Sequence, residues 1–242
     1  MSKSDGHHHQ VVMPHDHYAH ADVSGGWLRA ATFGAMDGLV SNTALIAGVA
    51  ATADAHTVVL SGVAGLLAGS FSMALGEYTS VTTANEQIDS EVHAEREAFK
   101  QFPRGEQMEL VAMFKELGMT AETAKIAAAE VHRDEERALK FHVAQELGID
   151  PHEKPSARVA AFSSFLMFAV GALIPLLPYL FGIQALWPGL LCGGVGLLIA
   201  GALAARFTRG SMWFGAGRQL TFGVIAIAAT YLMGKLIGGV VS

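Results

Sequence analysis

Long apolar segments alternate with polar ones along this chain, and their lengths suit helices that span a membrane. Residues 159–205 form a run of 47 positions without Asp, Glu, Lys or Arg. A helix of about 20 apolar residues crosses a bilayer, so this run predicts two spans, hinged around residues 182–184. Three further apolar segments each have the length of one span. The five predicted spans cover about residues 27–50, 57–80, 159–181, 185–207 and 212–234.

A polar segment of about residues 81–156 separates the second and third spans, and its pattern is helical. The second span meets no helix breaker before Pro103, so its helix is expected to continue into this insert. Gly118 supplies a stop signal and Thr120 an N-cap. Insert helices are predicted over about residues 81–101, 106–117 and 120–147. The predicted fold class is all-α, an integral membrane protein with five transmembrane helices and a helical insert between helices 2 and 3.

The pattern divides the chain into four parts. These are a His-rich cytoplasmic tail (1–26), transmembrane helices 1 and 2 (27–80), an acidic three-helix cytoplasmic domain (81–156) and transmembrane helices 3–5 (157–242). The six His of the tail form a composition that can gather metal ions, and the tail is interpreted as disordered. It is not basic and then apolar, so no cleavable signal peptide is predicted and the first span serves as the insertion signal.

The basic residues predict the orientation of the chain. Fifteen of the 16 Lys and Arg fall in the segment up to Arg29, in residues 81–158 and in residues 206–218. Cytoplasmic segments carry the excess of Lys and Arg, so these three segments are expected to face the cytoplasm. The N-terminus is then cytoplasmic and the C-terminus lies outside, in the inner (plasma) membrane of a cell.

Composition excludes two broad classes of function. Hydrophobic residues make up 51% of the chain and charged residues only 16%, against about a quarter in soluble domains. A soluble enzyme is therefore excluded, and the net charge of −6 argues against a nucleic-acid partner. Cys192 is the one cysteine and lies within an apolar run, so there is neither a disulfide framework nor a CxxC metal site.

Two acids lie inside predicted spans, Asp37 in the first and Glu77 in the second. A carboxylate at membrane depth costs at least about 2.5 kcal/mol, so it usually faces a cavity or a partner. Met73 shares a helix face with Glu77, and antiparallel spans bring all three side chains into the inner half of the bilayer. Two carboxylates and a thioether suit a divalent metal such as Fe²⁺. Taken alone, Met73 is better explained as a packing residue than as a metal ligand. For the two acids the metal-binding explanation is the better one, because a helix cap at Asp37 and an interfacial position of Glu77 account less well for the cost of burying them.

The insert carries three pairs of potential metal ligands, each pair on one helix face. The pairs are Glu91 with Glu95, Glu106 with Glu109, and His142 with Glu146. Three helices could direct them at one metal ion. Taken singly, each pair is better explained as part of a solvated acidic face with salt bridges. His132 and Glu135, three residues apart, remain an alternative auxiliary pair but are better explained as surface residues than as ligands.

Three motifs resemble the vacuolar iron transporter family in its bacterial form. They are DGLVSN at 37–42, SMALGEY at 72–78 and GALIPLLPY at 171–179, and the resemblance covers about residues 27–240. It implies a five-span homodimer that moves Fe²⁺, and often Mn²⁺, out of the cytosol in exchange for protons. The resemblance also implies a translocation path at the dimer interface, where the family's first-span Asp and second-span Met match Asp37 and Met73.

The resemblance further implies a metal-binding insert. The family's glutamate positions there match Glu95, Glu106, Glu109 and Glu146. One family glutamate falls on Ala98, with Glu91 or Glu97 as substitutes, and the paired methionines of the plant pattern fall on His142 and Val143. A second-span acid of plant members falls on Gly65, while Glu77 supplies an acid three turns later. His in place of Met makes the ligand set less soft.

The sequence therefore predicts a proton-coupled exporter of Fe²⁺, with Mn²⁺ as an alternative cargo, rather than an enzyme. It is expected to hold no prosthetic group and to act as a homodimer in the lipid bilayer. Two alternatives stay open. One is a membrane-anchored metal buffer or sensor that does not transport. The other is a membrane di-iron oxidase, which the absence of any Glu-x-x-His pair in the insert disfavours.

Overall fold

A computed structural model describes residues 26–147 and 154–241 of the chain; residues 1–25 of the His-rich tail, predicted to be disordered, lie outside these ranges. All regular structure in the described ranges is helical, which confirms the predicted fold class. The helices are α1 (Gly26–Ala50), α2 (Ala55–Gln101), α3 (Pro103–Glu116), α4 (Ala121–Val131), α5 (Glu135–Leu147), α6 (Ala157–Leu173), the 3₁₀ turn η1 (Ile174–Leu176), α7 (Leu177–Leu180), α8 (Leu186–Phe207) and α9 (Met212–Val241).

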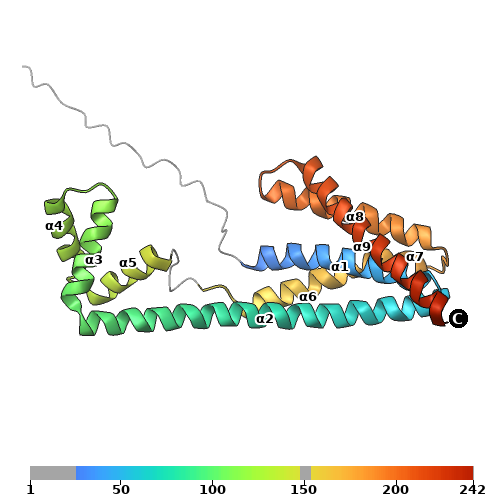
Figure 1. Cartoon of the computed structure of the whole chain (residues 1–242), viewed down its shortest axis with the longest axis horizontal. Coiled ribbons are helices and arrows are strands. Elements are labelled where there is room, and N and C mark those ends of the chain that lie inside the picture. The colour runs from blue at the N-terminus through green and yellow to red at the C-terminus, as the bar shows by residue number, and fades with distance from the viewer. Residues whose placement is uncertain (1–25, 148–153, 242) are drawn as a thin grey trace, which may run out of the picture.

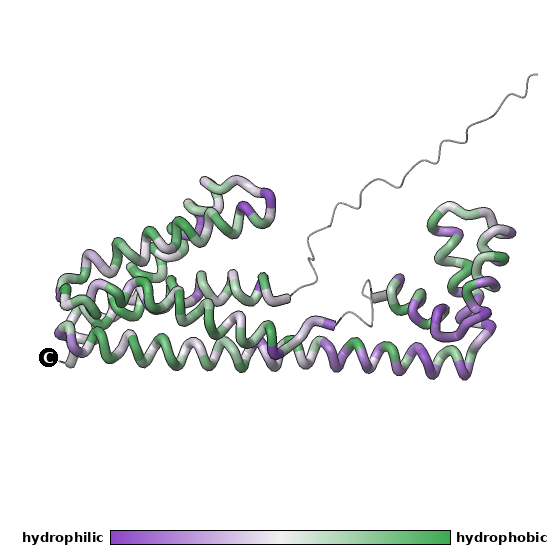
Figure 2. Tube along the Cα trace, turned by 180° about the vertical axis from the view of Figure 1, so that it is seen from behind, coloured by the Kyte–Doolittle hydropathy of each residue, from purple (hydrophilic) through white to green (hydrophobic). Residues whose placement is uncertain are grey.

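Five stretches of helix within the described residues are long and apolar enough to cross a membrane, as predicted. They are Gly26–Ala50, Ala55–Gln101, Ala157–Leu180, Leu186–Phe207 and Met212–Gly238. Figure 2 shows the apolar residues concentrated in this bundle and the hydrophilic ones in the insert. The third span differs from the continuous helix expected, because Pro175 and Pro178 interrupt the backbone hydrogen bonding and produce η1 and the short α7.

The first span, α1, is the central helix of the bundle and packs against α2, α6, α8 and α9. Its approach to α6 is so close that a Cβ atom at Gly38 would collide with the carbonyl oxygen of Phe168. Small residues at such positions allow the backbones of membrane helices to come together. Between the same two helices, the side-chain amide of Asn42 donates to the carbonyl oxygen of Ala172 at 2.6 Å. Packing and hydrogen bonding therefore fix the face that α1 turns toward α6.

The second span, α2, is 47 residues long and belongs to both halves of the molecule (Figure 1). The carboxylate of Asp54 caps its first turn by accepting from the backbone N–H of Thr57 at 2.9 Å. The helix then runs without interruption from the bundle to Gln101, where Pro103 starts α3. This confirms the prediction that the second span continues into the insert.

In the insert, α3 and α5 pack against the far end of α2, and α4 packs on α3 (Figure 1). The single helix predicted over residues 120–147 is wrong, because it is divided into α4 and α5. Asp134 starts α5 as an N-cap residue, its carboxylate accepting from the backbone N–H of Arg137 at 3.0 Å. Two small apolar clusters, around Phe99 and around Leu110, hold the four helices together.

Candidate metal path and cytoplasmic metal site

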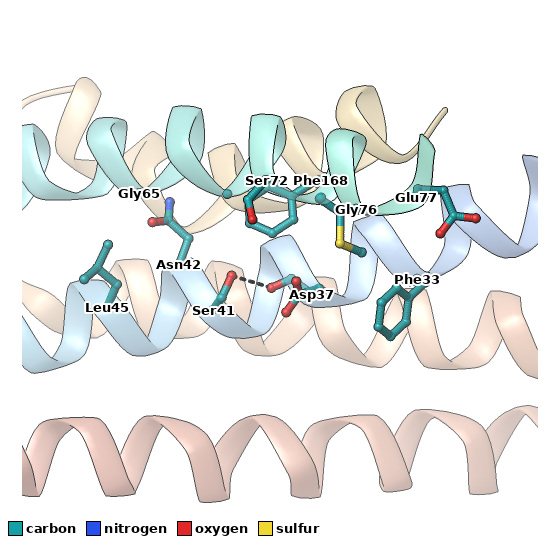
Figure 3. Close-up of a pocket in the computed structure, with 12 residues that line it drawn as sticks. Phe33, Asp37, Ser41, Asn42, Leu45, Gly65, Ser72, Gly76, Glu77 and Phe168 are labelled. Atoms are coloured by element: carbon teal, nitrogen blue, oxygen red, sulfur yellow. Dashed lines mark hydrogen bonds between the residues drawn. The ribbon is translucent and has the colours of Figure 1, made fainter. Parts of the chain in front are cut away.

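A cavity of about 570 Å³ lies between α1, α2 and α6 of the bundle. Its lining includes all three side chains predicted for the path, Asp37, Met73 and Glu77. Figure 3 shows Glu77 at one end of the cavity and Leu45 at the other, with Asp37 between them. The structure therefore brings together two carboxylates and a thioether from two antiparallel helices.

Asn42 is a further polar group in this cavity that the sequence reasoning missed. Its side chain is buried, and its Oδ1 atom has no hydrogen-bond partner among the described residues. Gly65 leaves room for that oxygen, since a Cβ atom there would lie only 3.2 Å from Oδ1. An amide oxygen is a hard ligand for a cation, so it adds to the ligand set that Asp37 and Met73 begin. The only signal in the sequence was an amide in the middle of an apolar span.

Glu77 forms an ion pair with Arg29 of α1. The Glu77 side chain is 10% exposed and that of Arg29 is 64% exposed. The pair connects α1 and α2 at the end of the cavity where Figure 3 shows Glu77, and Arg29 partly neutralises this acid. A guanidinium and a metal ion would compete for this carboxylate.

The cavity opens to the side of the bundle rather than being closed on all sides. Ser41 and Phe33, which line it, are both exposed. A carboxylate such as Asp37 is costly next to lipid chains. A protein surface that closes this side would remove that cost.

A second cluster of ligands lies in the insert, where Glu95 of α2, Glu106 of α3 and His142 of α5 come together. One ligand atom from each lies within 4.8 Å of the others. The His142 Nδ1 atom is 3.2 Å from Glu95 Oε1 and 3.7 Å from Glu106 Oε2. All three side chains are at least 85% buried, so the arrangement is built into the core of the insert.

The protonation and the unpaired polar atoms of this cluster suit the binding of a cation. Burial, with a smaller contribution from the charge of His132, lowers the pKa of His142 to about 4, so its imidazole is neutral near pH 7. Glu106 Oε2 and both ring nitrogens of His142 have no hydrogen-bond partner among the described residues. Buried polar atoms are normally paired. A divalent first-row metal would satisfy two carboxylates and a neutral imidazole together.

The remaining predicted ligands do not join this cluster. Glu91 and Glu109 are exposed on α2 and α3. Glu146 belongs to the last turn of α5, and its side chain lies outside the described residues. Two of the three predicted pairs thus contribute one member to the core and turn the other toward solvent.

His132 is less exposed than the surface position expected for it. The residue follows α4 directly and is half-buried. Its ring stacks on Phe99 with centroids 5.4 Å apart and lies 5.5 Å from the ring of His142. The division between α4 and α5 causes this placement, because it turns the end of α4 toward α5. Glu135, its supposed partner, is exposed.

Comparison with known proteins gives a consistent result. The model of the VIT family matches residues 28–235. A vacuolar iron transporter of Acanthamoeba castellanii is 35% identical over 220 residues, 87% of this chain and 78% of the relative. Vacuolar iron transporter 1 of Oryza sativa subsp. japonica is 29% identical over 238 residues, 97% of this chain and 92% of the relative. The resemblance expected from the three sequence motifs is thereby confirmed.

Proposed function

This chain belongs to the VIT family, and on that premise we propose that it transports Fe²⁺, with Mn²⁺ as an alternative cargo, out of the cytosol in exchange for protons. The observation that carries the proposal is the cavity that Asp37, Met73 and Glu77 all line within the spanning bundle. Relatives along nearly the whole chain bear the name vacuolar iron transporter.

The ligands of the cavity favour a borderline metal. Carboxylate and amide oxygens alone would suit Mg²⁺ or Ca²⁺, whereas the Met73 thioether adds affinity for softer ions. Asp37 and Asn42 lie on α1 and Met73 lies across from them on α2. An ion held between the two helices would leave when they move apart.

Proton exchange follows from charge balance. When a divalent ion leaves Asp37 in a medium of low dielectric constant, the carboxylate is most easily neutralised by a proton. A proton supplied from the outer side would then be released to the cytosol when the next metal ion binds. Each cycle moves metal outward and protons inward.

The insert would gather metal for the path. Its residues 81–156 carry 16 acids against nine Lys and Arg, and Glu95, Glu106 and His142 offer a built cluster of ligands. Glu95 and Glu77 lie on the same continuous helix, 18 residues and therefore roughly 27 Å apart. Metal would leave the insert cluster and enter the cavity past Glu77.

Orientation and assembly are part of the proposal. The bias of Lys and Arg favours a cytoplasmic N-terminus and insert, and the C-terminal end of α9 lies at the opposite end of the bundle (Figure 1). The open side of the cavity favours a homodimer, because a second copy would shield Asp37 from lipid. We further propose that the protein resides in the inner (plasma) membrane of a cell.

Metal flux into proteoliposomes under a pH gradient tests the proposal. Wild-type protein should move Fe²⁺ and Mn²⁺ together with counter-flowing protons. Asp37→Asn should abolish both fluxes, whereas Glu106→Gln should only slow them. Glu122→Gln, on the exposed surface of α4, is the matched control and should behave as wild type. Unchanged flux in Asp37→Asn would overturn the proposal.

The buffer or sensor alternative has one observation in its favour, because the insert cluster needs no membrane path to hold a metal ion. Metal binding by a wild-type protein that shows no flux would decide for it. The di-iron oxidase gains no support, since the described residues hold a single group of three ligands.

A further inference from the structure

Two imidazoles, one buried and one half-buried, lie side by side behind the insert cluster. His132, at the end of α4, and His142, on α5, have ring centroids 5.5 Å apart and an interplanar angle of 85°. Phe99 contacts both rings, stacked on one and edge-on to the other. Only His142 contributes to the group of ligand atoms that lie within 4.8 Å of one another. His132 therefore stands directly behind a ligand without being one.

The protonation pattern of His132 follows from one contact. Its Nδ1 atom lies 3.0 Å from the carbonyl oxygen of Ala128, which can only accept a hydrogen bond. Nδ1 therefore carries a proton, and in the neutral form of the ring Nε2 is left with a lone pair. That Nε2 atom is buried and has no hydrogen-bond partner among the described residues.

Metal binding requires the opposite protonation of His142, with the proton on Nε2 rather than on Nδ1. Its Nδ1 atom faces Glu95 and Glu106, so a metal ion held there would take the Nδ1 lone pair. The proton of the ring must then lie on Nε2, which is also buried and without a hydrogen-bond partner in the described part of the chain. A ligating histidine almost always donates its other ring N–H to an acceptor. In this core the acceptor must be found nearby.

We propose that His132 is a positioning residue for the insert metal site, accepting a hydrogen bond from His142 Nε2–H when His142 Nδ1 binds metal. The inference rests on the proposed metal-binding role of the insert. Centroids 5.5 Å apart leave room for a nitrogen–nitrogen contact of about 3 Å once the rings turn toward each other. The hydrogen bond fixes the ligating tautomer and orientation of His142 and makes its Nδ1 a stronger ligand.

This arrangement gives His132 a role in metal preference. A histidine ligand supported by a second histidine suits first-row ions that favour nitrogen ligands. The carboxylates alone would favour hard ions such as Mg²⁺ and Ca²⁺. Loss of the support should therefore weaken binding of Co²⁺ more than binding of Mg²⁺.

The test measures Co²⁺ binding by the full-length protein in detergent, using the visible absorption of the ion as the readout. His132→Phe keeps a ring against Phe99 and removes both nitrogens. The Ala128 oxygen stays paired in this variant, because it also accepts from the backbone N–H of His132. His132→Gln restores a donor and an acceptor. His142→Gln reports the Co²⁺ signal of the rest of the chain, including the His-rich tail.

We expect His132→Phe to bind Co²⁺ about 10- to 100-fold more weakly, with a shifted absorption band. Its metal-free melting temperature should not fall, and His132→Gln should recover part of the affinity. Unchanged affinity and absorption in His132→Phe, with loss in His142→Gln, would overturn the inference and leave the proposed function intact. A lower metal-free melting temperature in His132→Phe that accompanies the loss of Co²⁺ affinity, with no recovery of affinity in His132→Gln, would mean that His132 has only a structural role. That result would also overturn the inference. Absence of a His142-dependent signal in wild type would remove the insert site itself, and the Asp37 flux assay would then judge transport separately.

Discussion

At the scale of single residues, the chain places polar groups where they are costly and leaves some of them without protein partners. Asn42 Oδ1 in the cavity and Glu106 Oε2 in the insert are both buried acceptors of this kind. A cation would repay the cost of burying both. Two sites of similar chemistry thus lie at different heights along one molecule.

Acid should destabilise the metal-free insert through His142. Because the pKa of His142 is about 4 in the folded protein and about 6.5 when unfolded, the unfolded chain binds more protons between these values. Stability is therefore full above about pH 6.5 and falls as the pH drops to 4, by up to about 3 kcal/mol. Thermal melting of metal-free protein from pH 7 to pH 4.5 measures this loss. An equally steep loss in His142→Gln would contradict the assignment to this residue.

Replacement of Arg29 should change the affinity of the path for metal. Arg29→Gln removes the cation that competes for Glu77, so the apparent KM for Mn²⁺ in proteoliposomes should fall. An exposed ion pair is worth up to about 1 kcal/mol, which corresponds to a factor of about five. Arg29→Lys keeps the charge and serves as the control. A higher KM in Arg29→Gln would show that Arg29 assists entry instead.

At the scale of helices, the spacing of the acids in the insert predicted which residues share a helix face, but it did not predict which of them are buried. Glu106 and Glu109 were predicted as one pair of ligands. Glu106 lies on the same buried face as Leu110 and Phe114, which pack on α4, and this packing is a tertiary effect. Asp37 and Glu77 were predictable without such contacts, because charge in an apolar span carries its own signal.

The division between α4 and α5 was missed for a local reason. The segment contains neither Gly nor Pro, and its Ala-rich start is typical of a continuous helix. The available signal was Asp134 followed by two further acids, which is the pattern of a helix N-terminus. Missing it also hid His132, whose position depends on the division.

Interruption of α2 should separate metal gathering from transport. Ala84→Pro, at an exposed position between Glu77 and Glu95, disrupts a helix by about 3 kcal/mol. We expect Co²⁺ binding by the insert to persist while flux falls well below that of Ala84→Gly, which costs about 1 kcal/mol. Parallel binding and flux assays on both variants measure this. Full flux in Ala84→Pro would mean that a continuous α2 is not required.

At the scale of the whole molecule, the spanning bundle leaves one side of its polar cavity open. Membrane proteins avoid charged groups that face lipid. The number of spans and the position of the insert were predictable from hydropathy, but the open side was not. It depends on how α2 and α6 pack around α1.

Two copies should meet at the open side of the cavity. Replacement of Cys192, the one cysteine, gives a background without thiols. In that background, Ser41→Cys at the cavity rim should cross-link between copies in native membranes. Leu191→Cys, exposed on α8, is the control and should remain monomeric on denaturing gels. Equal cross-linking at both positions would argue against this interface.

The continuity of α2 also makes the helix a lever arm. Its membrane part is held by the bilayer, and its free end carries Glu95 roughly 27 Å beyond Glu77. A transmembrane helix adjusts its tilt to the thickness of the surrounding lipid. A change in tilt of about 10° would swing Glu95 sideways by roughly 5 Å. The lipid composition of the host membrane would thereby set where the insert stands above the membrane surface.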